Sequence, residues 1–580
     1  MLRRQLRGSR NLAAGLLVAT VAIGSSATTL ANFFAQDDVP LILEDSRARD
    51  IRQIKQIFTE GYWPAPTPRD LYRPLTSLLL SVEWQLGGGA SFSFKAVQVG
   101  LYAASAIAVL ILALQLLPFW GAVVTALFFA AHPVHVEAVA LGVNQAEVIV
   151  GLFSALAVAW YIARRRAGVP GWGAAAGLGL ATFVAAHFKE TGVMIAGLLV
   201  AAELFAVGAT APGRWRATRP VWLLQILAVE LVVVIRSFIQ PDRLSGTYTA
   251  EAFTGSSMWN RLETMLTVVP EWLRLHLWPA TLQADYSPRV IVQATGWGSA
   301  QWLGLAIVGM IIFLAFRLKS RAPVVLFGVA WVAIGLFPVS NVLVPTGITM
   351  AERTLFLSSI GAMLAVVAFG VEAIREIAER HQVAVQRVVI GGVIVITLLG
   401  ASRSISRHRI WRSSLSMWAQ TVVDAPESYR AWIAFGTLLY LTTSQERGIQ
   451  AYHIGLSLYD QSPGPMLQLA EWYRTREECP KAIPLYTTAL TFVEYAPALT
   501  SLTSCLAWEG DYRGAQQAAL RGMKTGYFGG LFHVWFRTAL DAERGNAPVH
   551  SVRFPKGHGY LFDQPTANPA GLQPGEKLVR

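Results

Sequence analysis

A succession of long apolar runs constrains the fold of this chain more than any other feature. Runs of about 17–25 apolar residues are long enough to cross the hydrocarbon core of a bilayer. Eleven candidate spans lie at 12–33, 95–117, 119–131, 145–163, 172–187, 193–209, 220–238, 299–316, 323–339, 355–374 and 387–402. The third is short, and we expect its continuation to be a broken or partly exposed helix. Because backbone polar groups need internal partners in lipid, the sequence predicts an all-α polytopic membrane protein.

The composition agrees with this class. Of the 580 residues, 53% are hydrophobic and 14% are charged, whereas soluble domains have about 25% charged residues. The net charge of +12 comes from short basic clusters between the apolar runs. Such clusters are typical of positive-inside topology and of contact with anionic membrane lipids, so we expect no nucleic-acid partner.

The basic clusters also predict the orientation. With residues 1–10 in the cytoplasm and the first run as an uncleaved signal-anchor, four successive inner loops carry arginine or lysine. This requires that the amphipathic stretch 263–282, which contains Glu271, Arg274 and His276, lies at the interface and does not cross.

This topology gathers the unusual polar residues on the outer face. Two adjacent acids, Asp37 and Asp38, follow the first span and open an outer loop at 34–94. The other outer polar residues are Arg73, His132, His135, Glu137, Lys189, Glu190, Glu352 and Arg353. A transporter would more often place such groups near the membrane midplane. Their position at one surface favours chemistry on a lipid headgroup.

The basic side chains of this set are candidate phosphate ligands. Lys189 offers a point charge to a phosphate, or pairs locally with Glu190. Arg353 could bind phosphate through two donors while Glu352 holds its guanidinium, or it could extend from the tenth span to the interface. Arg73 has the same two interpretations.

The two histidines have three interpretations. His132 and His135 could bind a metal ion, position an acceptor or phosphate, or have a purely structural role. The proline between them and the lack of a clear third ligand weaken the metal interpretation.

An internal repeat begins after the last span. The segment Arg447–Tyr452 is echoed 34 residues later by Lys481–Tyr486, and a third copy has drifted to Arg513–Ala518. Thirty-four residues is the tetratricopeptide period, so we expect a short α-solenoid. Cys479 and Cys505 lie in this part and could pair only if the fold brings them together.

The predicted organisation therefore has four parts. They are a cytoplasmic N-terminus at 1–10, a transmembrane domain at 11–402 with the outer loop 34–94 and an interfacial segment at 239–298, a repeat domain on the outer side at 403–545, and an irregular or disordered tail at 546–580.

Several motifs occur in the order found in a known family. They are Phe-Ala-Gln-Asp-Asp at 34–38, Tyr-Arg-Pro-Leu-Thr at 72–76, His-Pro-Val-His-Val-Glu-Ala-Val at 132–139, Lys-Glu-Thr-Gly at 189–192 and Ala-Glu-Arg-Thr-Leu-Phe-Leu-Ser-Ser-Ile-Gly at 351–361. Over roughly 30–530 the chain resembles the transmembrane and tetratricopeptide-repeat O-mannosyltransferases. One departure is Asn-Gln-Ala-Glu at 144–147, where that family commonly has Gly-Arg-Ala-Asp.

The resemblance implies a GT-C-type inverting glycosyltransferase. Such an enzyme would move a sugar, mannose being the expected one, from a polyprenyl phosphate to a Ser or Thr hydroxyl of a protein or peptide acceptor outside the cytosol. The acid of the first outer loop, Asp37 or Asp38, would act as base, and the repeats would hold the acceptor. A departing single phosphate needs no cofactor if basic side chains suffice, although Asp37, Glu137 and His135 could supply ligands to a divalent metal ion.

The expected location is a bacterial inner membrane with the site and the repeats in the periplasm, or the lumenal side of the endoplasmic reticulum in a eukaryote. The alternative from another class is a non-catalytic, membrane-anchored repeat scaffold. That alternative gives no reason for five polar motifs on one face.

Overall fold

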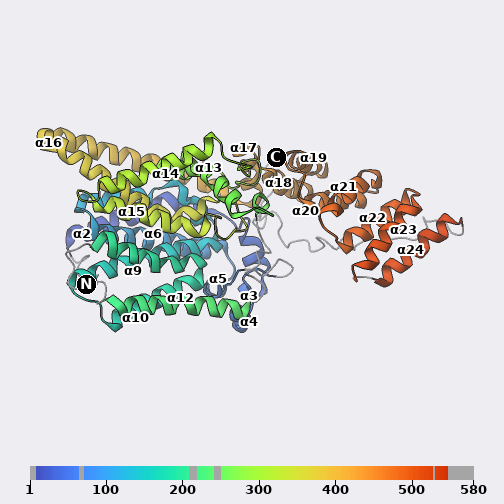
Figure 1. The fold of residues 1–580 in the computed structure, drawn as a ribbon, viewed down its shortest axis with the longest axis horizontal. Helices are drawn as coiled ribbons and strands as arrows, with labels where there is room; N and C mark the ends of the chain where they lie inside the picture. The colour runs from blue at the N-terminus through green and yellow to red at the C-terminus, as the bar shows by residue number, and fades with distance from the viewer. Residues whose placement is uncertain (1–7, 65–70, 208–217, 241–249, 527–528, 546–580) are drawn as a thin grey trace. The chain divides into compact units, whose positions relative to one another are not determined.

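The protein is described by a computed structural model at residues 8–64, 71–207, 218–240, 250–526 and 529–545, with the side chains of 376–383 and 529–531 left out. Throughout these ranges the regular elements are helices (Figure 1). The chain forms two compact units. The first comprises the described parts of residues 1–287 and 291–424, and the second comprises residues 288–290 and those from Ala425 onward.

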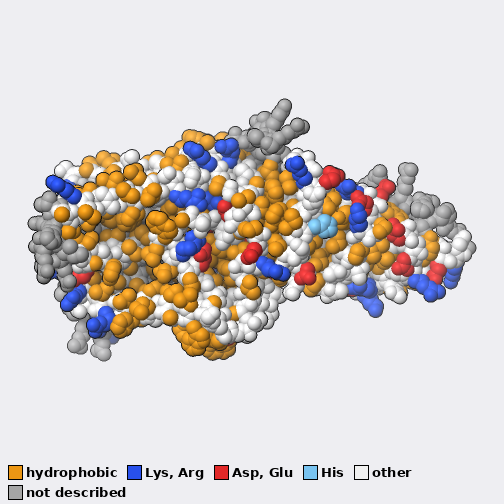
Figure 2. Space-filling model, turned by 90° about the horizontal axis from the view of Figure 1, so that it is seen from above, with side chains coloured by type: hydrophobic (Ala, Val, Ile, Leu, Met, Phe, Trp, Pro, Cys, Tyr) orange, Lys and Arg blue, Asp and Glu red, His pale blue; other side chains and the backbone are white. Residues whose placement is uncertain are grey.

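The first unit contains the apolar helices. Its helices are α2 Ser9–Ser26, α3 Ser46–Arg49, α4 Ile54–Thr59, α5 Pro74–Gly87, α6 Ser91–Leu116, α7 Phe119–Ala130, α8 Val136–Ala140, α9 Gln145–Ala167, α10 Trp172–Phe188, α11 Met194–Ala201, α12 Arg219–Ile239, α13 Met258–Leu277, α14 Ser299–Arg317, α15 Pro323–Leu336, α16 Phe356–His408 and α17 Ser414–Asp424. Hydrophobic side chains cover broad areas of its visible surface (Figure 2).

The helices match the predicted spans. In the described residues, eight helices are long and apolar enough to cross a membrane. The pair Phe119–Ala130 and Pro133–Ala140, bent by 45°, makes a ninth when it is counted as one span. Two shorter apolar helices, Trp172–Phe188 and Pro323–Val339, complete the eleven predicted runs. The bend lies where the third run continues, and the continuation was expected to be a broken or partly exposed helix. It is broken and buried. Helix α13 is absent from this set, in agreement with its amphipathic sequence.

Helix α16 contains two of these spans, at Glu352–Arg375 and Ala384–Arg412. Met363 and Gly400 line the same pocket. In a straight helix their separation of 37 residues would place them about 55 Å apart. The helix therefore turns back on itself and forms two arms, which lie together in Figure 1.

The core of the first unit is packed closely enough for backbones to touch. A Cβ atom added at Gly328 of α15 would lie 2.5 Å from the carbonyl oxygen of Gly361 in α16. Small residues that allow such an approach are typical of helix packing in membranes. The contact holds α15 against the first arm of α16, directly after the Glu352–Arg353 motif.

The first unit continues past residue 402, where the repeat domain was predicted to begin. Trp411 is 1% exposed, and Arg407 pairs with Asp424. The backbone nitrogen of Phe33 donates to the Arg412 carbonyl over 3.0 Å. The stretch up to Asp424 thus packs on the membrane unit and supports the loop that carries the two adjacent acids.

The second unit consists of helical hairpins. Its helices are α18 Tyr429–Thr442, α19 Gln445–Leu458, α20 Pro463–Thr475, α21 Cys479–Phe492, α22 Ala496–Trp508, α23 Tyr512–Lys524 and α24 Gly529–Glu543. The first helices of three successive hairpins begin at Tyr429, Pro463 and Ala496, close to the predicted period of 34 residues. Stacking joins the hairpins, as between Tyr440 and Trp472, whose ring centroids lie 3.8 Å apart.

A disulfide ties two of these hairpins together. Cys479 at the start of α21 is bonded to Cys505 in α22. The sequence left this pairing open because nothing in the spacing shows that the two helices meet.

Candidate active site

The turn at Phe34–Asp38 is held rigidly from both sides. Phe34 is fully buried and packs edge-on against Phe94, with 5.2 Å between ring centroids. Gln36 adopts a left-handed backbone conformation with φ 47°, and its backbone nitrogen donates to Ser414 Oγ over 2.9 Å. The turn carries Asp37 and Asp38 next to each other, and the first is partly exposed while the second is buried.

Asp38 points into the protein. Its Oδ2 accepts from Lys95 Nζ over 2.7 Å, and both side chains are fully buried. The backbone nitrogens of Gly142 and Val143 donate to the same carboxylate over 3.1 and 2.9 Å. Lys95 also donates to the Ala140 carbonyl over 2.7 Å. These contacts give Asp38 a structural role, joining the turn to the segment before α9.

Asp37 takes no part in these contacts and is partly exposed. No described residue forms a hydrogen bond or ion pair with its carboxylate. Burial raises the pKa of Asp37 above its usual value; the charge of Arg353 opposes this shift, and those of Asp38 and Glu137 reinforce it. Asp37 is thus an available carboxylate with a raised pKa.

Arg353, whose charge acts on Asp37, is held in place by Glu137. Its backbone nitrogen donates to Glu137 Oε2 over 2.9 Å, and its Nη1 pairs with Glu137 Oε1. The expectation that Glu352 holds the guanidinium is wrong. Glu352 instead accepts from the Gln283 backbone nitrogen over 2.6 Å and from the Tyr286 hydroxyl over 3.1 Å. Neighbours in a short helical turn diverge, which separates the two side chains.

The other two basic candidates are also paired. Lys189 pairs with Glu147 of α9, so the interpretation of a local pair with Glu190 is wrong. Glu190 accepts from Arg73 through both Nε and Nη2, the shortest contact being 2.9 Å. The Arg73 guanidinium lies 5.2 Å from the ring centroid of Tyr62.

The two histidines are satisfied by protein groups. His132 Nε2 lies 3.1 Å from the His276 carbonyl oxygen. His135 Nε2 lies 2.8 Å from Ser359 Oγ, and its Nδ1 lies 3.0 Å from the Tyr102 hydroxyl. Both rings are buried. Of the three interpretations, these contacts favour the structural role, in which the His132–His135 turn is fixed against α6, α13 and α16.

A metal site is not assembled in the part of the chain that the structure describes. No group of three or more His, Cys, Asp or Glu side chains there could hold an ion. Asp37, Glu137 and His135 are therefore not brought together as a ligand set.

Two residues of this region were not singled out from the sequence. Lys95 was read as the first residue of the second span, although a single lysine there is costly in lipid and is itself a signal. Glu147 was noted only as a departure from the family pattern, and its pairing with Lys189 depends on two spans meeting.

One of the solved structures to which this chain is similar comes from an archaeon. The archaeal oligosaccharyltransferase AglB from Archaeoglobus fulgidus, in complex with an inhibitory peptide and a dolichol-phosphate, aligns with a TM-score of 0.40 and 13% identity. The alignment covers 76% of this chain and 59% of that one.

Curated relatives give the sequence comparison, since no protein-family model matches the chain. Protein O-mannosyl-transferase TMTC3 of Mus musculus is 22% identical over 79% of this chain and 52% of its own length. Protein O-mannosyl-transferase F38B6.6 of Caenorhabditis elegans is 21% identical over 75% of this chain and 60% of its own length. Tmtc2 of Drosophila melanogaster is 29% identical over 51% of this chain and 32% of its own length.

The chain thus spans about half the length of the relatives it matches, from 32% to 60% in these three. The resemblance inferred from the five motifs is confirmed: homologues of this chain are protein O-mannosyl-transferases of the transmembrane and tetratricopeptide-repeat family.

Proposed function

We propose that the chain is a GT-C-type inverting glycosyltransferase that moves mannose from a polyprenyl phosphate to a Ser or Thr hydroxyl of a protein acceptor. The observation that carries this proposal is the unpaired, partly exposed carboxylate of Asp37 within the field of Arg353 and Arg73. The names of the curated homologues support the sugar and the type of acceptor.

Asp37 is the proposed base. As the acceptor hydroxyl oxygen forms its bond to the anomeric carbon, the bond from that carbon to the phosphate oxygen breaks, and the hydroxyl proton passes to Asp37. A raised pKa makes the ionised carboxylate a better proton acceptor. Asp38 is excluded from this role in our proposal because its carboxylate is already shared by an ammonium group and two backbone N–H groups.

Arg353 is the proposed ligand of the leaving phosphate. Its contacts with Glu137 use the backbone nitrogen and Nη1, which leaves Nε and Nη2 as a planar pair of donors. Such a pair matches two phosphate oxygens, and it stabilises the charge that develops as the phosphate leaves on its lipid. Arg73 is already paired with Glu190, and Lys189 with Glu147. We therefore assign these two cations to the electrostatic field around Asp37 and Arg353 and to secondary contacts with the donor.

The site and the repeats are proposed to lie on the non-cytoplasmic side, in the periplasm for a bacterial protein. The disulfide between Cys479 and Cys505 supports this, because disulfides persist in oxidising compartments. The basic inner loops support the same orientation. We further propose that the helical hairpins of the second unit bind the acceptor, since stacked hairpins of this kind offer extended binding surfaces.

Transfer by the purified full chain tests this function. Radiolabelled mannose on a polyprenyl phosphate is supplied with a panel of Ser- and Thr-containing peptides, and donors carrying other sugars are run in parallel. The expected result is labelled peptide with the mannose donor, lost in the Asp37→Asn variant and retained in Asp50→Asn, a change of an acid in the same outer loop whose partner Arg52 is 87% exposed. No transfer from any donor would contradict the proposal.

A further inference from the structure

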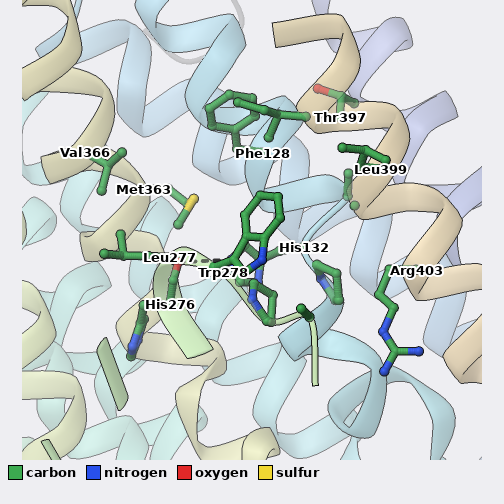
Figure 3. A pocket seen from close by; sticks show the side chains of 16 residues that line it. Phe128, His132, His276, Leu277, Trp278, Met363, Val366, Thr397, Leu399 and Arg403 are labelled. Atoms are coloured by element: carbon green, nitrogen blue, oxygen red, sulfur yellow. Dashed lines mark hydrogen bonds between the residues drawn. The ribbon is translucent and has the colours of Figure 1, made fainter. Parts of the chain in front are cut away.

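An apolar pocket of about 380 Å³ lies between the end of α13, the end of α7 and the two arms of α16. Its walls are mostly hydrophobic side chains: Phe128, Leu277, Trp278, Met363, Val366 and Leu399. In Figure 3, Thr397, Leu399 and Arg403 follow one arm of α16, and Met363 and Val366 lie on the other. The volume falls in the range of small-molecule sites, about 300–1,000 Å³. Asp37, Glu137 and Arg353 are not among its lining residues.

The pocket is reachable from the side of the helix bundle. Three residues of its lining, Val366, Ile396 and Leu399, are exposed at 39%, 48% and 54%. The span that contains two of them, Ala384–Arg412, has only 6% of its most apolar window buried within the protein. An apolar surface of this kind faces lipid, so a chain from the bilayer can enter between the two arms.

One cation in the lining has no counterion. Arg403 forms no ion pair with any described carboxylate, and its Nε is buried without a hydrogen-bond partner. The hydroxyl of Thr397, a turn and a half earlier on the same arm, is also buried and unpartnered. Two acids, Asp424 and Glu352, act on Arg403 through their charge, but both have other partners. Asp424 pairs with Arg407, and Glu352 accepts hydrogen bonds from the Tyr286 hydroxyl and the Gln283 backbone nitrogen.

The two histidines of the lining, His132 and His276, do not provide an anion or an acceptor for Arg403. His132 Nε2 is engaged by the His276 carbonyl, and His276 Nε2 lies 2.8 Å from Ser358 Oγ. A buried donor without an acceptor is costly, and the Nε of the half-buried Arg403 is such a donor. The pocket therefore combines an apolar cavity open to lipid with a guanidinium that lacks an anion.

We infer that this pocket binds one anionic membrane phospholipid, with an acyl chain between the arms of α16 and the head-group phosphate on Arg403. The occupant is a bilayer lipid and not the reacting donor, because the donor phosphate must reach Asp37 and Arg353, which do not line the pocket. The exclusion of the donor rests on the proposed function, whereas the binding measurements below need no transferase activity.

Native mass spectrometry of the delipidated full chain tests the inference. The protein is titrated with phosphatidylglycerol, with zwitterionic phosphatidylethanolamine, and with a polyprenyl phosphate. The variants are Arg403→Gln, which removes the charge, and Val366→Trp, which fills the pocket from its exposed wall. The matched control for the charge is Arg409→Gln, an exposed arginine in the turn after α16. The control for the filled pocket is Val395→Trp, exposed at 55% on the arm that carries Arg403 but outside the lining.

The expected result is one phosphatidylglycerol per chain, bound at least about tenfold more weakly in Arg403→Gln and Val366→Trp, because a charge-assisted hydrogen bond contributes this much. The two controls should bind as the unchanged protein does. Equal binding of phosphatidylethanolamine, binding that survives both variants, or a site that polyprenyl phosphate occupies in preference to phosphatidylglycerol would each overturn the inference. Thermal unfolding of each variant separates loss of the site from loss of the fold.

Discussion

Lys95 Nζ lies 2.7 Å from Asp38 Oδ2 in a fully buried ion pair, while the adjacent Asp37 has no partner of this kind in the described residues. Two neighbouring acids that are indistinguishable in the sequence therefore have different surroundings. Asp38 anchors the turn through Lys95, Gly142 and Val143, and Asp37 is left available for chemistry.

The pair of Lys95 and Asp38 should be strongly coupled in stability. Lys95→Met alone is expected to lower the free energy of unfolding by about 3–5 kcal/mol, because it leaves the Asp38 charge buried and unpaired. The double change Lys95→Met with Asp38→Leu should cost much less than the sum of the single changes. Unfolding in detergent, measured as a double-mutant cycle, checks this.

The exposed pair of Arg52 and Asp50 is the control for this cycle. Its coupling should be less than about 1 kcal/mol, since solvent screens such pairs. A buried pair no more strongly coupled than this control would remove the structural role assigned to Asp38.

Substitution of Asp37, in contrast to that of Lys95, should not destabilise the protein. Its pKa is raised in the folded state, so ionisation is less favourable there than in the unfolded chain. The folded state therefore loses stability from this group as the pH rises above the unfolded pKa, near 3.8. We expect Asp37→Asn to be as stable as the unchanged protein or more stable at pH 7, with the difference vanishing below about pH 3.8. Thermal unfolding against pH measures it, and a marked loss of stability at pH 7 would show that Asp37 has a structural partner.

The pH dependence of transfer should report Asp37. The base must be ionised, so kcat/KM should fall on the acid side as the pH drops through the raised pKa of Asp37. Arg353 opposes the raised pKa, so Arg353→Gln should move this acid limb to higher pH as well as lowering the rate, by about 10²-fold for a lost charge-stabilising donor. A slower enzyme with an unmoved acid limb would mean that Arg353 does not act on the base.

The repeat unit should contain no free thiol. Cys479 and Cys505 are the two cysteines of the chain, and they are bonded to each other. A maleimide reagent should label the unfolded protein only after reduction. The Cys479→Ser, Cys505→Ser variant should lower the stability of the second unit by about 2–4 kcal/mol. Labelling without a reductant, in protein taken from its native membrane, would argue against an oxidising compartment.

The spans could be predicted because the length and hydropathy of a segment are enough to identify them. The repeat could be predicted because its period of 34 residues is visible in Arg447–Tyr452 and Lys481–Tyr486. The partners in the site were not predictable in the same way. Glu137 and Arg353 are 216 residues apart, and Asp38 meets Lys95 across 57 residues. Only the packing of α6, α8 and the turn before α16 brings these groups together. Local reasoning therefore paired Arg353 with Glu352 and Lys189 with Glu190, and both pairings were wrong.

The sequence also could not show which of the two adjacent acids is free to act as a base. Local sequence places Asp37 and Asp38 at one helix end, and nothing there distinguishes them. The distinction comes from the left-handed conformation at Gln36 and from the donors that reach Asp38, which are Lys95 and the backbone nitrogens of Gly142 and Val143. No periodicity in the sequence reveals these contacts.

The single-turnover rate of mannose transfer in Asp37→Asn tests the central claim most directly. With saturating polyprenyl-phosphate mannose and a Ser- or Thr-containing peptide, the account predicts a rate lower by about 10²–10⁴-fold with unchanged donor binding and an intact fold, because one proton acceptor has been removed. Asp50→Asn should transfer at the rate of the unchanged protein. A rate in Asp37→Asn within a few fold of the unchanged protein would contradict the account and remove Asp37 as the base.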